Sequence, residues 1–286
     1  MVFHLGVNNY KNTSKTDRYE NITDLIDLWK TQVKVWNLSY QHPRRGLCQP
    51  VWNLLSFLDK TPVKRRSTLG GGSAPQSCPL GFSGVIHMPS EIVLASSSEI
   101  RARILRNAGL EIVTVPARID EEMIRQSLSA EGATPRDLAD FLAESKALKV
   151  SSRHPGALCL GADQVLELKG KVFSKPESPE EAISQLSELS GQTHRLLSAL
   201  VVVRDGAPLW RHVGEARLTM RPLSAPFIAD YVAENWEQIR HCVGCYRIEA
   251  EGIRLFSAIQ GDLFTVQGLP LLPLLNWLHV RGDLDT

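Results

Sequence analysis

The sequence has no run of about 18 consecutive apolar residues, so we expect no membrane-spanning helix in it. Its first residues lack a basic segment followed by an apolar core and a small-residue cleavage site, which argues against a secretory signal. Cysteine is scarce and odd in number, at Cys48, Cys78, Cys159, Cys242 and Cys245. Such scattered cysteines argue against a disulfide scaffold and indicate a reducing, cytoplasmic setting.

Neither sign of charge is in strong excess, but charge is unevenly placed. The 286 residues carry a net charge of +1, with 43% hydrophobic and 22% charged residues, an ordinary composition for a globular protein. Residues 1–88 hold 11 Lys/Arg against 5 Asp/Glu, whereas residues 89–286 hold 21 against 26. We therefore expect a basic N-terminal extension with a linker (1–88) and one compact domain (89–286).

The extension has no sustained core pattern, so we expect it to be poorly ordered. Met88 directly precedes the compact domain, and initiation there would leave the extension untranslated. A nucleic-acid-binding arm is the alternative, because basic residues lie among three of the six tryptophans. We favour the poorly ordered extension and expect neither a nucleic-acid nor a membrane partner.

The compact domain opens with a short strand that breaks through three serines into a helix. Ile92–Ala95 is an apolar run suited to a buried strand, and apolar residues recur at helical spacing from Glu99 to Gly109. Free backbone N–H groups, hydroxyls and the positive end of a helix dipole meet at such a joint, which favours a phosphate anion. Arg101 adds a planar fork of donors. An ordinary serine-capped helix is the alternative.

The rest of the domain alternates strands and helices early and has hairpins later, which predicts an α/β fold with a mixed sheet. Strands are expected at residues 111–115 and 157–161, in a hairpin at 166–172 with its turn at Lys169-Gly170, on both sides of Asp205-Gly206, and at 253–259 and 264–266. Helices are expected from Pro135, after the Thr134 cap, with an apolar stripe that reaches Leu148, and at 178–191, 224–234 and 271–279.

Several polar residues follow the expected strands, where ligands bind in such sheets. Asp163 follows the strand at 157–161, and Asp120 and Glu121 follow the preceding one. Three lysines are candidate phosphate partners: Lys146, Lys171 and Lys175. Carboxylates that hold a divalent ion, beside cations that offset phosphate charge, are what phosphoryl chemistry needs. Each residue alone has a plainer explanation, since helical lysines usually face solvent and such acids often cap helices.

Two other features are weaker candidates. Cys242-Val-Gly-Cys245 has the spacing of a redox or zinc motif, but no second pair accompanies it at metal-ligand spacing. His194 has no serine or cysteine motif around it, so we expect no catalytic triad. We expect His194 at most to hydrogen-bond the wall of a cleft.

Many short motifs occur in the order seen in Maf-like nucleoside triphosphate pyrophosphatases, and residues 89–282 resemble that family. The motifs are Leu94-Ala-Ser-x-Ser, Arg101, Asp120-Glu121, Leu142-Ala-x-x-Lys146-Ala, Gly161-Ala-Asp163-Gln164, Lys175-Pro176, Leu189-Ser-Gly-x-Thr-His194, Gly244-x-Tyr246 and Gly268-Leu-Pro270. The resemblance implies a Maf/ITPase-like fold: a mixed twisted sheet with flanking helices and a central nucleotide-binding cleft. It also implies a homodimer that hydrolyses a nucleoside triphosphate to monophosphate and pyrophosphate.

The matching positions imply roles for individual residues. Asp163 matches the family's general-base aspartate, which would draw a proton from the water that attacks the α-phosphorus. Asp120 or Glu121 matches an acid that, with Asp163, would help to place Mg²⁺ or Mn²⁺. The matching phosphate-binding positions are Ser96, Ser98, Arg101, Lys146 and Lys175.

Three positions at which this chain differs from one branch of the family bear on which nucleobase it recognises. The branch that acts on dTTP and UTP has arginine, threonine and glutamine where this chain has Ile100, Gln164 and Glu249. Gln164 and Glu249 instead resemble the branch that acts on 7-methyl-GTP, which usually has tryptophan at the position of Ile100. A carboxylate suits the N1–H and N2 donors of guanine and suits poorly the acceptors of a pyrimidine. We expect a purine-leaning range, with 7-methyl-GTP as one candidate.

A second hypothesis is a non-catalytic nucleotide-binding regulator of cell division, since the family that the chain resembles has been linked to septum formation. A pure binder has no need of an acid such as Asp163 beside bound phosphates, which it would repel unless a metal intervenes. Asp163 therefore favours the enzyme.

Overall fold

The computed structural model describes residues 26–27, 30 and 90–284. The chain divides into two units between Ile86 and His87, and the fold given below is that of the second. The predictions for residues 1–88 lie almost wholly outside the described residues. In the part of the chain that the structure describes, no helix is both long and apolar enough to cross a membrane.

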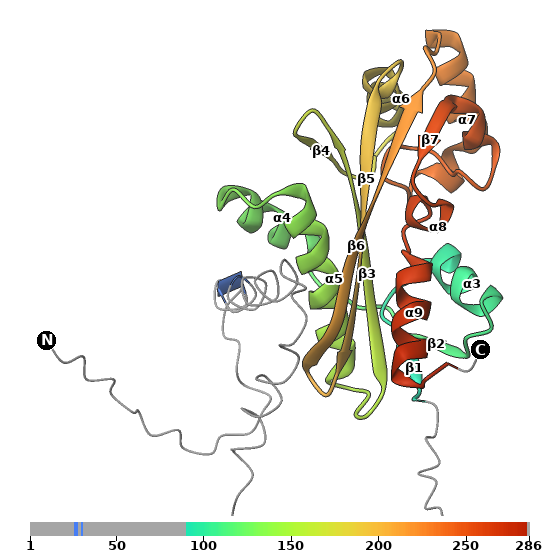
Figure 1. The fold of residues 1–286 in the computed structure, drawn as a ribbon. Coiled ribbons are helices and arrows are strands. Elements are labelled where there is room, and N and C mark those ends of the chain that lie inside the picture. Colours follow the sequence, from blue (N-terminus) through green and yellow to red (C-terminus); the bar gives the residue numbers. More distant parts are fainter. Residues whose placement is uncertain (1–25, 28–29, 31–89, 285–286) are drawn as a thin grey trace, which may run out of the picture. The chain divides into compact units, whose positions relative to one another are not determined.

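The second unit is built on a mixed seven-stranded sheet (Figure 1). The strands are β1 (Ile92–Leu94), β2 (Ile112–Thr114), β3 (Leu158–Leu168), β4 (Lys171–Phe173), β5 (Thr193–Arg204), β6 (Ala207–Met220) and β7 (Phe256–Gln260). Their order is β2-β1-β3-β5-β6-β7, and β4 pairs with β3. Strand β1 is parallel to β2 and β3, and all other pairs are antiparallel. The predicted α/β fold with a mixed sheet is confirmed.

Helices cover both faces of this sheet (Figure 1). They are α3 (Glu99–Asn107), α4 (Glu121–Ala130), α5 (Pro135–Ser151), α6 (Pro179–Leu189), α7 (Ala225–Ile239), α8 (Leu263–Val266) and α9 (Leu271–Arg281), with a 3-10 turn at Glu251–Leu255. Helix α5 begins where its capping box predicts, since the Thr134 side chain accepts from Asp137 N. Helix α6 likewise begins after Ser178, whose side chain accepts from Glu181 N.

The apolar residues form two main cores, one at each end of the long strands. One core joins α3 and α9 to β1 and to the first half of β3, including Leu158 and Leu160. The other joins α6 and α7 to the second half of β3, including Leu166 and Leu168. The middle of β3, with Asp163, lies between them. Polar side chains there interrupt the apolar pattern, which leaves room for a site.

Three sequence predictions about these elements are wrong. Strand β3 does not end at Gly161 but runs to Leu168, because β5 pairs with it continuously from Cys159 to Glu167. Residues 264–266 are helical rather than extended, because the Asp262 side chain caps α8 by accepting from Thr265 N. Residues 253–255 belong to the 3-10 turn, so only the second part of that segment is the strand β7. Helix α4 has no counterpart in the sequence predictions.

Candidate functional site

The site lies at a gap in the sheet beside β3. On the side of β3 away from β5, β1 pairs only with residues 158–160 and β4 only with residues 166–168. The edge of β3 is therefore open between them. Because neighbouring residues of a strand point to opposite faces, an open edge lets both Asp163 and Gln164 reach one pocket.

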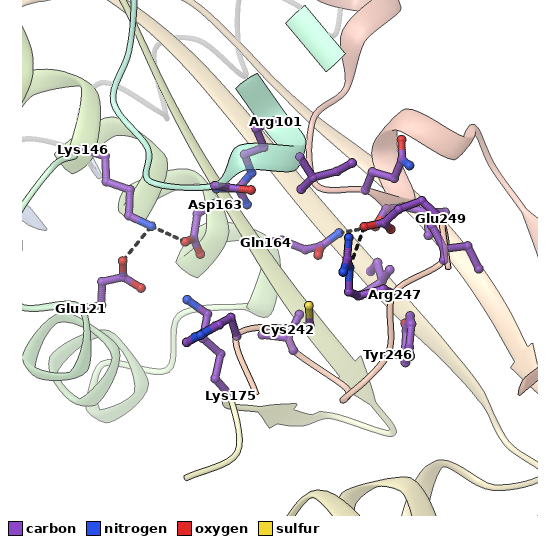
Figure 2. A pocket seen from close by; sticks show the side chains of 18 of the residues that line it. Arg101, Glu121, Lys146, Asp163, Gln164, Lys175, Cys242, Tyr246, Arg247 and Glu249 are labelled. Carbon is purple, nitrogen blue, oxygen red and sulfur yellow. Dashed lines mark hydrogen bonds and ion pairs between the residues drawn. The ribbon is translucent and has the colours of Figure 1, made fainter. Parts of the chain in front are cut away.

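At one end of the pocket, a lysine stands between two carboxylates (Figure 2). Lys146 Nζ lies 2.6 Å from Asp163 Oδ1 and 2.9 Å from Glu121 Oε1. These side chains come from α5, β3 and α4. Lys146 and Asp163 are both buried, with side chains only 9% and 6% exposed. Burial alone would raise the pKa of Glu121, but Lys146, Lys175 and Arg125 outweigh it and hold that pKa below its usual value.

Close backbone packing sets the distance between Lys146 and Asp163. A Cβ on Gly161 would lie 2.0 Å from Ala143 O and 2.7 Å from Ala147 N. Only glycine therefore lets α5 approach β3 this closely. Lys146 precedes Ala147 on α5 and Asp163 lies two residues after Gly161, so this contact brings the ammonium to the carboxylate.

Arg101, on α3, is held by backbone carbonyls beside the same pocket. Its Nε donates to Gly268 O at 2.9 Å and its Nη1 to Ala162 O at 2.8 Å. Burial lowers the pKa of Arg101, and the charges of Asp163 and Glu121 act in the opposite direction. The guanidinium thus ties α3 to the open edge of β3 at a fixed position.

The serines before α3 differ in their placement. Ser98 is the N-cap residue of α3 and lines the pocket, but its side chain makes no capping hydrogen bond. The joint therefore differs from the ordinary serine-capped helix that was the alternative to an anion site. Ser96 is buried and does not line the pocket; its Oγ accepts from Ser98 N at 3.2 Å. Ser96 therefore supports the turn, whereas Ser98 is available to a ligand.

Two lysines of the β4 region also differ. Lys175 lines the pocket, and its charge acts on Glu121 and on Cys242 (Figure 2). Lys171 does not line it and instead forms an ion pair with Glu188. Of these two candidate phosphate partners, only Lys175 is brought to the site.

The other end of the pocket carries the residues predicted to meet the base (Figure 2). Gln164 Nε2 donates to Thr265 O and Val266 O, at 3.2 and 3.0 Å, which leaves its Oε1 as the atom for a ligand. Glu249 Oε1 accepts from Arg247 Nε at 3.0 Å. Ile100 also lines the pocket. This end of the pocket thus offers acceptors on Gln164 and Glu249, with the Arg247 guanidinium beside Glu249.

The three carboxylates proposed for a metal are not brought together. Asp120 is exposed, does not line the pocket, and caps α4 by accepting from Met123 N at 3.0 Å. Within the described residues, no group of three His, Cys, Asp or Glu side chains is placed to hold a metal ion. Glu121 and Asp163 remain, both directed at Lys146. Two carboxylates fit Mg²⁺, which binds one or two of them together with substrate phosphates.

The cysteine pair and His194 have structural surroundings. Burial raises the pKa of the Cys242 thiol, and it raises that of Cys245 to about 12. Both are free thiols, with no metal-binding group around them among the described residues. His194 is fully buried, and its Nε2 lies 2.7 Å from the hydroxyl of Tyr246, a residue that lines the pocket. His194 thus supports the cleft wall.

Two arginines of the pocket were missed by sequence reasoning. Arg125 lies on α4, which was not predicted, and Arg247 follows the Gly244-x-Tyr246 motif. The spacing of Glu121 and Arg125, four residues apart, would have placed both on one face had the helix been recognised.

Comparisons with known proteins agree on one family. A family model described as Maf-like protein matches residues 91–280. The chain is 54% identical over 199 residues to a nucleoside triphosphate pyrophosphatase of Ruegeria pomeroyi, covering 70% of this chain and 100% of the relative. It is 56% identical over 197 residues to a protein of the same name from Roseobacter denitrificans, covering 69% and 99%. It is 49% identical over 198 residues to a 7-methyl-GTP pyrophosphatase of Brucella abortus, covering 69% and 100%. With its matching model, its relatives and this pocket, the chain belongs to the Maf-like protein family.

Proposed function

We propose that this protein is an enzyme that hydrolyses nucleoside triphosphates to nucleoside monophosphate and pyrophosphate. The observation that carries the proposal is Asp163, a buried carboxylate in a pocket that holds Lys146 and Lys175 at one end and Gln164, Glu249 and Arg247 at the other. The names of the relatives in Ruegeria pomeroyi and Roseobacter denitrificans support the same reaction.

In the proposed reaction, Asp163 is the general base. Its Oδ1 is held by Lys146, while its Oδ2 accepts no hydrogen bond within the described residues. Oδ2 takes a proton from water as the water oxygen bonds to the α-phosphorus. The bond from that phosphorus to the bridging oxygen breaks, and pyrophosphate leaves with the bonding electrons. Ser98, Arg101, Lys146 and Lys175 surround the phosphates and offset their charge.

We propose Mg²⁺ or Mn²⁺ as cofactor, held by Glu121 and Asp163 together with substrate phosphates and without Asp120. When bound, such an ion neutralises phosphate charge. Glu121→Gln should raise the Mg²⁺ concentration needed for half-maximal pyrophosphate release. Asp120→Asn is the matched control, because asparagine caps a helix as well as aspartate does. Equal effects of the two changes would restore Asp120 as a ligand.

We propose that the enzyme prefers nucleotides with a purine nucleobase, with 7-methyl-GTP as a candidate substrate. Acceptor oxygens on Gln164 and Glu249 suit the donor edge of guanine. The 7-methyl-GTP pyrophosphatase of Brucella abortus, at 49% identity, supports this range. A screen of 7-methyl-GTP, GTP, dTTP and UTP for pyrophosphate release tests it. A clear preference for dTTP would contradict the guanine argument.

The variant Asp163→Asn tests the reaction itself. We expect pyrophosphate release to fall by about 10² to 10⁴, the usual contribution of a general base, while nucleotide binding persists. Unchanged turnover would refute the role of Asp163. A wild-type protein that binds nucleotides but releases no pyrophosphate would instead favour the regulator of cell division.

We also propose a cytoplasmic location and a homodimer. The free thiols of Cys159, Cys242 and Cys245 support a reducing compartment. The homodimer rests on the family resemblance, and light scattering of the purified protein tests it.

A further inference from the structure

Arg125 occupies a position that neither the motifs nor the proposed reaction uses. It lies on α4 one turn after Glu121, and both residues line the pocket. Its side chain is only 16% exposed. The guanidinium reaches towards the general base, with Nη2 3.6 Å from Asp163 Oδ2. That distance makes an ion pair but is too long for a hydrogen bond.

The second terminal nitrogen of Arg125 is unsatisfied. Nη1 is buried and has no hydrogen-bond partner in the part of the chain that the structure describes. Buried donors nearly always have an acceptor, so an orphaned N–H in a pocket indicates that a ligand supplies one. A guanidinium N–H calls for an anionic oxygen, and two oxygens of a phosphate group can accept from the planar guanidinium at once.

Two other cations of the pocket already have partners. Lys146 bonds both Asp163 and Glu121. Arg101 bonds the carbonyls of Gly268 and Ala162. Unlike these two side chains, Arg125 has a buried N–H donor without a hydrogen-bond acceptor among the described residues.

The positions of the two ends of the pocket indicate which part of the substrate lies near Arg125. Gln164 and Glu249 mark the base end, and Glu121 lies on the opposite side of Asp163 (Figure 2). Arg125 shares the helix of Glu121. A nucleotide that places its α-phosphorus at Asp163 therefore extends its β- and γ-phosphates towards α4.

We propose that Arg125 binds the β- and γ-phosphates of the substrate and stabilises the pyrophosphate that leaves. This inference rests on the proposed function for the orientation of the nucleotide. As the bond to the α-phosphorus breaks, negative charge grows on the oxygen that bridged the α- and β-phosphorus atoms and that becomes a terminal oxygen of pyrophosphate. A preorganised guanidinium in a buried site is placed to stabilise that charge.

Binding of the two products to the full-length protein tests the proposal. Isothermal titration in Mg²⁺ buffer measures the affinities for inorganic pyrophosphate and for GMP. Arg125→Gln should weaken pyrophosphate binding by about tenfold or more, in line with loss of a charge-assisted hydrogen bond, and should leave GMP binding unchanged. Arg125→Lys, which keeps the charge without the fork, should fall between. Arg103→Gln, an exposed change on α3, is the matched control.

The outcomes separate this inference from the proposed function. If Arg125→Gln slows turnover while both product affinities stay at the wild-type value, Arg125 acts only by positioning Asp163, and the inference is overturned. Equal weakening of pyrophosphate and GMP binding also overturns it. If the wild type releases no pyrophosphate from any nucleotide, the proposed function fails, yet selective loss of pyrophosphate binding in Arg125→Gln still supports an anion site at Arg125. Thermal melting confirms that each variant is folded.

Discussion

At the scale of single residues, Asp163 and Gln164 are neighbours on β3 that face the two ends of one pocket. Side chains of successive strand residues point to opposite faces, so neighbours normally cannot share a site. Here the edge of β3 is unpaired between the ends of β1 and β4, and both side chains reach the space beside it. The proposed general base, Asp163, and the residue proposed to contact the nucleobase, Gln164, are therefore adjacent in the chain.

Glu249 carries the prediction about the nucleobase. Glu249→Gln replaces one acceptor oxygen with a donor, which mismatches the N1–H and N2 donors of guanine. We expect the ratio of kcat/KM for GTP to that for UTP to fall by about tenfold or more, since bonds to a charged acceptor are strong. Steady-state kinetics on both nucleotides measure this. Glu251→Gln, outside the pocket, should keep the wild-type ratio; a shared loss would point to distortion of the loop.

His194 carries a prediction about pH. Burial lowers its pKa from an ordinary 6.5 to about 4, so the folded protein disfavours its protonation. Between pH 6.5 and 4 the unfolded chain therefore binds more protons at this site, and the free energy of unfolding falls as the pH is lowered. The difference at pH 5 is about 2 kcal/mol relative to pH 7.

Urea unfolding of wild type and His194→Gln at pH 7 and pH 5 checks this. The variant should lose about 2 kcal/mol less than wild type over that interval. Tyr246→Phe removes the hydrogen-bond partner but keeps the imidazole buried, so its pH dependence should match that of wild type. An equal pH dependence in wild type and His194→Gln contradicts the assignment.

At the scale of elements, the packing of α5 on β3 sets the site. Gly161→Ala places a methyl group 2.0 Å from Ala143 O, so the helix must move away from the strand. We expect a loss of about 1–3 kcal/mol or more in the free energy of unfolding. We also expect pyrophosphate release to fall by about a hundredfold, because Lys146 shifts relative to Asp163.

Gly156→Ala is the comparison for this change. Gly156 has a φ of 78°, and a methyl group added there would meet nothing within 4 Å, so alanine costs backbone strain alone, about 1–3 kcal/mol. Its pyrophosphate release at a temperature where the protein is folded should equal that of wild type. Chemical unfolding measures the loss of stability in both variants, and the release assay measures their activity. Full activity in Gly161→Ala would show that α5 can shift without loss of pyrophosphate release.

At the scale of the whole molecule, the described residues that line the pocket all belong to the second unit. All described residues that line the pocket fall between Ser98 and Gln267. The relative from Ruegeria pomeroyi is matched over 100% of its length by 70% of this chain. We expect a chain that starts at Met88 to keep the kcat/KM of the full chain.

Assay of both chains on the same nucleotide measures this. Nucleic-acid binding by the full chain that weakens steeply with salt, and that the shorter chain lacks, would favour the arm hypothesis instead. Loss of activity in the shorter chain, with a normal melting temperature, would assign residues 1–87 to catalysis.

Local signals in the sequence were enough for many elements. The serine break before Glu99, the capping residues Thr134 and Ser178, and the turn at Asp205-Gly206 act within a few residues, so the chain specifies them by itself. The order of short motifs pointed to the family and to Asp163. Helix α4 escapes prediction because Asp120, the residue that caps it, also has the chemistry of a metal ligand.

Only the tertiary structure decided where the chemistry lies. The middle of β3 stays extended because β5 pairs along its length, and its other edge stays open because β1 and β4 stop short. Lys146 reaches Asp163 because Gly161 lets α5 approach, and Arg125 joins them from a third element. The sequence by itself determined the residue types and the local turns. Distances between groups far apart along the chain follow from packing, because the free energy that sets them is shared among elements.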